Sequence, residues 1–124
     1  MKKRILFVDD DPNVLAGLRN LMHRERTRWE AVFVDDGASA LRELSQTKFD
    51  VIVSDMRMPE MDGVELLEQV RVRWPGTARI MLSGSADREE VARATAAVDE
   101  LLGKPCSSVV LKATLERIME RSTA

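Results

Sequence analysis

Short apolar runs recur along the sequence, and the longer segments between them carry apolar residues at helical spacing. Four runs are apolar at every position, namely residues 5–8, 31–34, 51–53 and 80–82. A strand that is buried on both faces, as in a parallel sheet, has this continuous pattern. A further candidate, Leu101 with Leu102, is short and weak as a strand when it is taken alone. The runs therefore predict four buried strands followed by a short fifth.

Apolar residues between the runs recur every three or four positions, which marks one face of an α-helix. Asp11 and Pro12 open the first such segment as N-cap and first-turn residues, and Asp87 with Glu90 resembles a capping box before the fourth. The stripes are Val14, Leu15, Leu18, Leu21 and Met22; Ala38, Leu41 and Leu44; Val64, Leu67, Val70 and Trp74; Val91, Thr95 and Val98; and Leu111, Leu115, Ile118 and Met119. Alternating strands and helices predict an α/β fold with one parallel sheet covered on both faces.

Size and composition suit one globular domain. The 124 residues, 44% of them hydrophobic, are enough to form a single core. A net charge of −2 gives no support to a nucleic-acid surface, and no apolar run approaches the roughly 20 residues that cross a bilayer. The single cysteine excludes an internal disulfide and suits a reducing compartment. We therefore expect one cytoplasmic domain over residues 1–124, without membrane or direct nucleic-acid contact.

Polar residues gather where the predicted strands end. Asp9 and Asp10 follow the first strand, Asp55 follows the third, Ser83 the fourth and Lys104 the fifth. Ligands of such folds bind at the carboxyl ends of the strands, so these loops are expected to converge. Several carboxylates in one small pocket repel one another unless a hard cation such as magnesium lies among them.

Phosphoryl transfer to a carboxylate uses the same residue types. An aspartate can act as a nucleophile and form an aspartyl phosphate. The transferring group needs its negative charge compensated, for which Lys104 and the Ser83 hydroxyl are suitable. The convergence of acids, a hydroxyl and a lysine from distant loops predicts this chemistry.

Four strings in the sequence resemble the receiver domain of two-component response regulators in order and spacing. They are ILFVDDDP at 5–12, DVIVSDMRMPEMDG at 50–63, IMLSGSAD at 80–87 and GKPC at 103–106. The resemblance implies a (βα)5 flavodoxin-like doubly wound parallel sheet with strand order 2-1-3-4-5. It also implies a signalling switch, not an enzyme with external substrates, that accepts a phosphoryl group from a histidine kinase or phosphotransfer protein.

The resemblance assigns a magnesium site and a phosphoacceptor to individual residues. Asp55 is the phosphoacceptor, and Asp10 and Asp55 hold magnesium (Mg2+) directly. Asp9 acts on the ion mainly through water, and the backbone carbonyl of Arg57 completes the protein ligands.

The resemblance also implies how the phosphoryl group is held and its signal passed on. Ser83 is the switch hydroxyl, Lys104 pairs with the phosphoryl group, and the Lys104–Pro105 bond is cis. The face made by the fourth helix, fifth strand and fifth helix relays the change to a partner or to a second copy of the chain.

A finer resemblance concerns the output of the switch. The strings MRMPEMDG, LSGSADRE and LGKPC look like receivers that precede HD-related output domains of the HDOD or HD-GYP type. No such output domain lies within these 124 residues.

Two positions depart from the family pattern. Leu101 stands where receivers usually carry an aromatic switch residue. A leucine there can fill the inward pocket permanently, which leaves signalling to movement of the loop after Ser83. Arg57, two residues after Asp55, can shield the phosphoryl group or pair with an acid across the pocket.

Several candidate residues have a simpler structural explanation. Asp11 is better explained as a helix cap than as a metal ligand, Asp35 and Asp36 as turn residues, and Asp62 as a turn and N-cap. His23 lies late in a polar helical stretch and suits a solvated residue, and Cys106 suits a structural free thiol.

Two other functions compete with the switch. A phosphatase of the haloacid dehalogenase type also forms an aspartyl phosphate, but it carries a second aspartate at the position of Arg57. An interaction module that keeps the fold and does not depend on phosphorylation is the other alternative.

Overall fold

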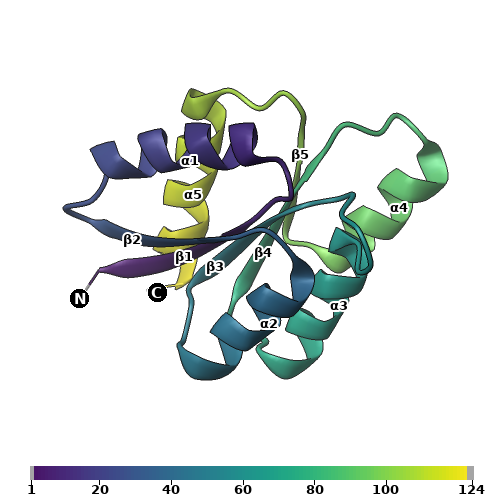
Figure 1. Ribbon diagram of the computed structural model, residues 1–124, viewed down its shortest axis with the longest axis horizontal. Helices are drawn as coiled ribbons and strands as arrows, with labels where there is room; N and C mark the ends of the chain where they lie inside the picture. Colours follow the sequence, from purple (N-terminus) through teal and green to yellow (C-terminus); the bar gives the residue numbers. More distant parts are fainter. Residues whose placement is uncertain (1, 123–124) are drawn as a thin grey trace.

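Five parallel strands and five helices alternate in the computed structural model, which describes residues 2–122, with residues 121 and 122 described by their backbone alone. They are β1 (Lys3–Val8), α1 (Pro12–Arg24), β2 (Trp29–Val34), α2 (Gly37–Gln46), β3 (Val51–Asp55), α3 (Gly63–Arg73), β4 (Ala78–Ser83), α4 (Arg88–Ala97), β5 (Glu100–Gly103) and α5 (Ser108–Ser122). The sheet order is β2-β1-β3-β4-β5 (Figure 1). This is the flavodoxin-like doubly wound order, so the predicted fold class and strand order are confirmed.

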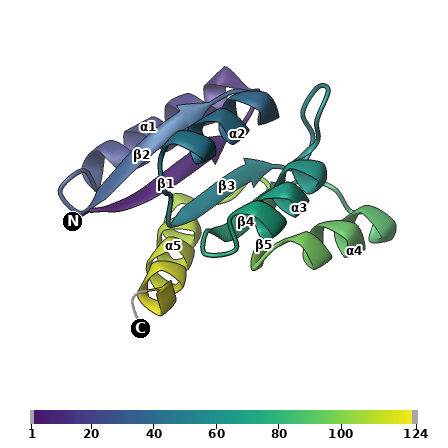
Figure 2. The same ribbon diagram turned by 90° about the horizontal axis from the view of Figure 1, so that it is seen from below.

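Helices cover both faces of the sheet, with α1 and α5 on one face and α2, α3 and α4 on the other (Figure 2). Side chains alternate along β1: Ile5 and Phe7 pack under α1 and α5, and Leu6 and Val8 pack under the other three helices. All four are at most 1% exposed. Burial on both faces requires an apolar residue at every position, which explains the continuous runs of β1, β3 and β4. The prediction of a fully buried strand is wrong for β2, whose apolar run at residues 31–34 is only partly buried because β2 lies at the edge of the sheet. Within the described residues, no helix combines the length and apolarity needed to span a membrane.

β1 and β2 each begin two residues before their apolar runs, at the amino end of the sheet. β1 begins at Lys3, and Arg4 in this extension pairs in register with Glu30 of β2. The Arg4 guanidinium lies 3.4 Å from the Glu30 carboxylate. β5 lies at the opposite edge, beside β4, and none of its residues is fully buried.

Aspartates cap the first four helices. The side chains of Asp11, Asp36, Asp62 and Asp87 each accept a hydrogen bond from a backbone amide two or three residues ahead, at 2.7 to 2.9 Å. Each bond satisfies an amide that has no partner within its own helix. The structural explanations of Asp11 and Asp62 as caps are confirmed, and Asp36, which was predicted as a turn residue, is the N-cap of α2.

The predicted capping box before α4 is only half formed. Asp87 accepts from the Glu90 amide at 3.0 Å, but the Glu90 carboxylate does not return to the Asp87 amide. That amide donates instead to the Ser85 hydroxyl at 3.1 Å. Glu90 binds Arg57 and Ser85 because those two donors offer its carboxylate a charged and a hydroxyl partner at once.

The start of α3 packs directly on the loop that follows β3. The Gly63 amide donates to the Met56 carbonyl at 2.8 Å. A Cβ atom at Gly63 would lie 2.2 Å from the Asp55 carbonyl oxygen and 3.0 Å from the Met56 Cα atom. Because both of these are backbone atoms, a side chain at this position would displace the loop that begins at Asp55.

We expect Gly63→Ala to lower the free energy of unfolding by about 1–3 kcal/mol, the usual cost of overpacking. Urea unfolding measures it. Gly17→Ala is the matched control, because Gly17 lies inside α1 and a Cβ there meets nothing within 4 Å. It should raise the free energy by about 0.5–1 kcal/mol through helix propensity. Equal stability of Gly63→Ala and wild type would contradict the close approach.

Candidate functional site

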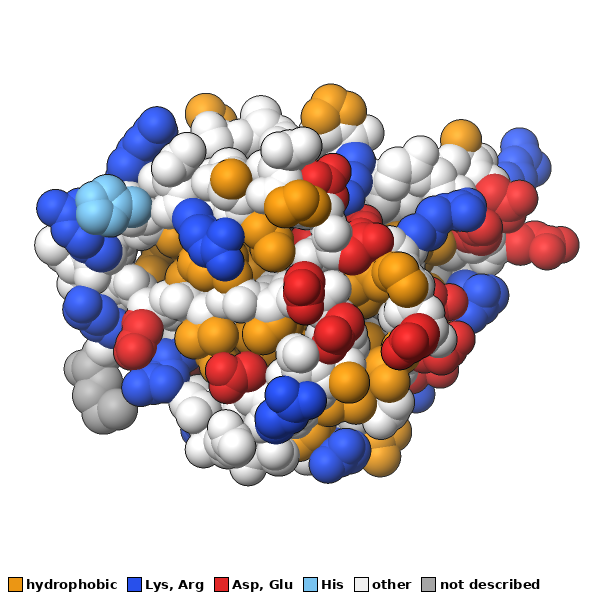
Figure 3. Space-filling view, viewed as in Figure 1, with side chains coloured by type: hydrophobic (Ala, Val, Ile, Leu, Met, Phe, Trp, Pro, Cys, Tyr) orange, Lys and Arg blue, Asp and Glu red, His pale blue; other side chains and the backbone are white. Residues whose placement is uncertain are grey.

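The candidate site lies at the carboxyl edge of the sheet, where the strand order reverses between β1 and β3. Asp9 and Asp10 directly follow β1, Asp55 closes β3, Ser83 closes β4 and Lys104 follows β5. Acidic side chains gather to the right of centre in the view of Figure 3, toward the end of the sheet where β1 and β3 stop in Figure 1. The predicted convergence of these loops is therefore observed.

Three carboxylates form the centre of the site. Each of Asp9, Asp10 and Asp55 offers an oxygen, and these oxygens all lie within 4.8 Å of one another. Asp9 and Asp55 are 1% and 9% exposed, and Asp10 is exposed. The backbone holds the buried pair: Asp9 accepts from the Asp11 amide and Asp55 from the Met56 amide, both at 2.9 Å. Such hard oxygen donors are those that magnesium prefers, so the donor set fits this ion.

Lys104 provides the positive charge next to these acids. Its ammonium nitrogen lies 2.8 Å from Asp55 Oδ1 and 3.2 Å from Asp9 Oδ2. Burial favours the neutral amine, but the contacts with Asp55 and Asp9 outweigh it, and the pKa of Lys104 is raised. The lysine is therefore charged throughout the physiological range. Its Lys104–Pro105 peptide bond is cis, as the family resemblance implied.

The carboxyl group of Asp55 is harder to ionise than an ordinary aspartate. Burial raises its pKa, and the negative charge of Asp9 acts in the same direction. Hydrogen bonds from Lys104 and from the Met56 amide act in the opposite direction without cancelling the rise. One ammonium group among three carboxylates leaves the site with an excess of negative charge.

The Ser83 hydroxyl lies at this edge but is directed toward a thioether. It donates to Met56 Sδ at 3.0 Å and accepts from the Ser85 amide at 3.1 Å. Met56 is 5% exposed, so its sulfur is a buried partner. Sequence reasoning did not identify Met56, because nothing in its type or position beyond adjacency to Asp55 suggests a contact with Ser83.

The Arg57 guanidinium binds a carboxylate of α4. It donates to Glu90 Oε1 at 2.7 Å, and 72% of the Arg57 side chain is exposed. Of the two roles considered for this residue, pairing with an acid across the pocket is the one observed. A hydrogen bond from Ser85, and then the contact with Arg57, lower the pKa of Glu90. Sequence reasoning placed Glu90 in a capping box and missed this pair.

Leu101 occupies the position at which receivers usually carry an aromatic residue. It is half-buried and packs against the core layer beneath α2, α3 and α4, which includes Met56, Met81 and Ala94. Its neighbour Leu102 packs against the opposite layer. Leu101 therefore faces inward, on the same side of the sheet as Met56.

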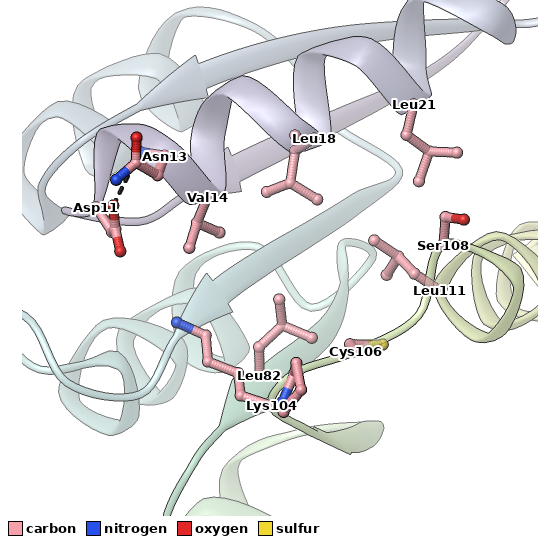
Figure 4. Close-up of a pocket in the computed structure, with 12 residues that line it drawn as sticks. Asp11, Asn13, Val14, Leu18, Leu21, Leu82, Lys104, Cys106, Ser108 and Leu111 are labelled. Carbon is pink, nitrogen blue, oxygen red and sulfur yellow. Dashed lines mark hydrogen bonds between the residues drawn. The ribbon is translucent and has the colours of Figure 1, made fainter.

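Two openings flank the site. One has a volume of about 400 Å³ and is lined by Asp55, Met56, Arg57, Gly84, Ser85 and Lys104. The other, about 570 Å³, lies between α1 and the segment that leads from β5 into α5. There Val14, Leu18 and Leu21 of α1 face Leu82 and Leu111 across the groove (Figure 4). Lys104 borders both openings, so the groove leads to the acidic cluster.

A doubly wound sheet with clustered aspartates and a lysine at its carboxyl edge is the architecture expected of the receiver domains that the sequence resembles. The model of the response regulator receiver domain family matches residues 5–116. The chain belongs to this family and is a receiver domain of the two-component response-regulator type.

Similar proteins span a range of lengths. The chemotaxis protein CheY of Pseudomonas aeruginosa is 35% identical over 121 residues, which cover 95% of this chain and 97% of CheY. The transcriptional regulatory protein GlrR of Escherichia coli (strain K12) is 33% identical over 119 residues, but these are 26% of its length. The matched segment is thus nearly the whole of one relative and a minor part of another.

A solved structure agrees with the finer resemblance. The signal receiver domain of an HD domain-containing protein from Pseudomonas fluorescens Pf-5 has a TM-score of 0.92 and 28% identity to this chain. The match covers 99% of this chain and 98% of that one. The similarity to receivers of HD-domain proteins is therefore present in structure as well as in sequence.

We expect Asp55→Asn to stabilise the metal-free protein at neutral pH. Because the pKa of Asp55 is raised on folding, the folded state binds the proton more tightly, and stability is lost as pH rises from the ordinary carboxyl value through the raised one. Asparagine removes this loss. Urea unfolding should give a higher free energy than wild type at about pH 7 and equal values at about pH 3.

Asp35→Asn is the control for that measurement, because Asp35 is an exposed aspartate after β2 and lies outside the acidic cluster. It should leave the stability difference between the two pH values unchanged. Lower stability of Asp55→Asn at neutral pH would show that pairing with Lys104 outweighs burial.

Proposed function

We propose that this receiver domain is a phosphorylation-dependent switch, in which Asp55 accepts a phosphoryl group from a histidine kinase or a phosphotransfer protein. The observation that carries the proposal is the contact between the buried Asp55 carboxylate and the Lys104 ammonium group inside a cluster of acids. Family membership supports the same function. We further propose that residues 1–124 form one receiver domain that acts in the cytoplasm without contacting nucleic acid or membrane.

Magnesium is the proposed cofactor. Asp10 and Asp55 would hold the ion directly, Asp9 would act mainly through water, and the Arg57 backbone carbonyl would complete the protein ligands. When bound, the ion would neutralise charge on the phosphoryl oxygens. The excess of carboxylates over ammonium groups at this edge supports a divalent cation.

The proposed transfer uses the side chains at the strand ends. A carboxylate oxygen of Asp55 bonds to the phosphorus of a phosphohistidine, and the phosphorus–nitrogen bond breaks with its electron pair left on the imidazole. Lys104, already beside Asp55, then pairs with a phosphoryl oxygen. Ser83 would turn its hydroxyl from Met56 toward the phosphoryl group, which its position at the end of β4 supports.

The apolar groove beside the site suits the docking of the phosphodonor. It lies between α1 and the start of α5, and Lys104 at its margin also lines the opening to Asp55. A donor protein seated there would bring its histidine to the carboxyl edge of the sheet. The signal would leave through the α4–β5–α5 face, toward a downstream protein, an output domain or a second copy of the chain in a homodimer.

Turnover of external substrates is not part of the proposal. An aspartyl-phosphate phosphatase needs a general acid two residues after the nucleophile, and Arg57 at that position pairs with Glu90. We therefore propose that the chain is not an enzyme beyond its own phosphorylation and dephosphorylation.

Incubation with magnesium and acetyl phosphate tests the switch. Intact-mass measurement should show one phosphate adduct on wild type and on the exposed control Asp35→Asn, and none on Asp55→Asn. Removing magnesium with a chelator should abolish the adduct, because the phosphoryl charge then lacks its divalent partner. An adduct that persists on Asp55→Asn would refute the assignment, and the absence of any adduct would favour an interaction module independent of phosphorylation.

A further inference from the structure

An ion pair joins the loop after β3 to the first turn of α4. The Arg57 guanidinium donates to both oxygens of Glu90, a residue 33 positions away, at 2.7 and 2.5 Å. The Ser85 hydroxyl donates to Glu90 Oε2 at 2.6 Å. One carboxylate therefore receives donors from two separate loops, and it does so in place of completing the capping box of its own helix.

This network continues to the residues beside the phosphoacceptor. Ser85 also accepts from the Asp87 amide at 3.1 Å, and its own amide donates to the Ser83 hydroxyl at 3.1 Å. Glu90 thus fixes the side chain of Ser85, which lies next to Ser83 in the network. Arg57 and Ser85 both line the opening of about 400 Å³ that leads to Asp55.

A phosphoryl group on Asp55 would compete with Glu90 for the same cation. It carries about 1.5 to 2 negative charges, whereas a carboxylate carries one. A guanidinium binds phosphate and carboxylate in the same two-pronged manner. Arg57 starts two residues from Asp55, and its head group is largely exposed, so exchanging one anion for the other requires no buried group to move.

We infer that Glu90 is a positioning residue that holds Arg57 away from Asp55, and that phosphorylation draws Arg57 onto the phosphoryl group and releases the first turn of α4. The inference rests on the proposed function, because it requires a phosphoryl group on Asp55. Glu90 then has a regulatory role, and Arg57 is the route by which charge at the site changes the contacts of α4.

The position of Arg57 affects the lifetime of the phosphorylated state. In hydrolysis a water oxygen bonds to phosphorus, the bond to the Asp55 oxygen breaks with its electrons left on the carboxylate, and both water hydrogens remain with the released phosphate. Arg57 on the phosphoryl group covers one approach of that water. Glu90 attracts the cation back to α4 and so shortens the lifetime.

The test is a double-mutant cycle on the loss of phosphate after acetyl phosphate is removed, followed by intact mass. Glu90→Gln, which keeps the shape of the side chain, should slow dephosphorylation by about two- to fivefold, the range of an exposed ion pair. Arg57→Gln should accelerate it. In the Arg57→Gln background, Glu90→Gln should have no further effect, because the cation that it controls is absent.

Glu89→Gln is the matched control, since it removes the same charge one residue earlier and its carboxylate makes no hydrogen bond or ion pair within the described residues. It should leave the lifetime unchanged. A second readout is the side-chain N–H resonance of Arg57, which beryllofluoride with magnesium should shift in wild type.

The outcomes separate the two proposals. An equal effect of Glu90→Gln with and without Arg57 would mean that Glu90 merely supports α4, and would overturn the inference. Phosphorylation of all variants with equal lifetimes would also overturn it while leaving the proposed function intact. A wild-type chain that takes up no phosphate would overturn the proposed function and this inference together.

Discussion

Helices cover the central strands β1, β3 and β4 on both faces. This two-sided burial determines where charged side chains can lie. An unpaired polar group inside such a strand costs about 1–3 kcal/mol. Ser54 is tolerated because its hydroxyl donates to the Asp55 carbonyl at 2.9 Å. Charged side chains reach partners only where the strands end, and there Asp9 and Asp55 are held by backbone amides and by Lys104. The fold thus brings its two buried acids together at the carboxyl edge of the sheet.

That concentration leaves an electrostatic imbalance. Lys104 touches both buried acids, yet the pKa of Asp55 is still raised, because burial and the charge of Asp9 together exceed the contribution of the lysine. A site in this condition gains free energy from an added cation, which is why the proposed magnesium ion fits it. Lys104 keeps its proton under the same influences, so it remains available to an incoming phosphoryl group.

Sequence patterns predicted what depends on local chemistry or on burial. Continuous apolar runs located the strands, and Asp11 and Asp62 were recognised as caps because capping needs only neighbouring amides. The partners of Ser83 and Arg57 were not predictable in this way. Each partner lies far away in the sequence from the residue that it binds. A hydroxyl or a guanidinium can bind many acceptors with similar energy, and only the packed fold determines which of them is within reach. The capping box is only half formed for the same reason, since the Glu90 carboxylate binds donors outside its own helix.

Signal transmission in this chain has to work without an aromatic switch residue. Leu101 already packs against the inner layer, which leaves an inward movement of this side chain little to report. Exposed ion pairs such as Arg57–Glu90 contribute little free energy, whereas a full reversal between two populations needs about 5.5 kcal/mol. The ion pair alone can therefore shift the balance between two positions of α4 but cannot reverse it. In the proposed switch the remaining free energy would come from groups buried at the site. The Ser83 hydroxyl, which donates to the Met56 sulfur, would exchange that contact for one with a phosphoryl oxygen and so contribute to it.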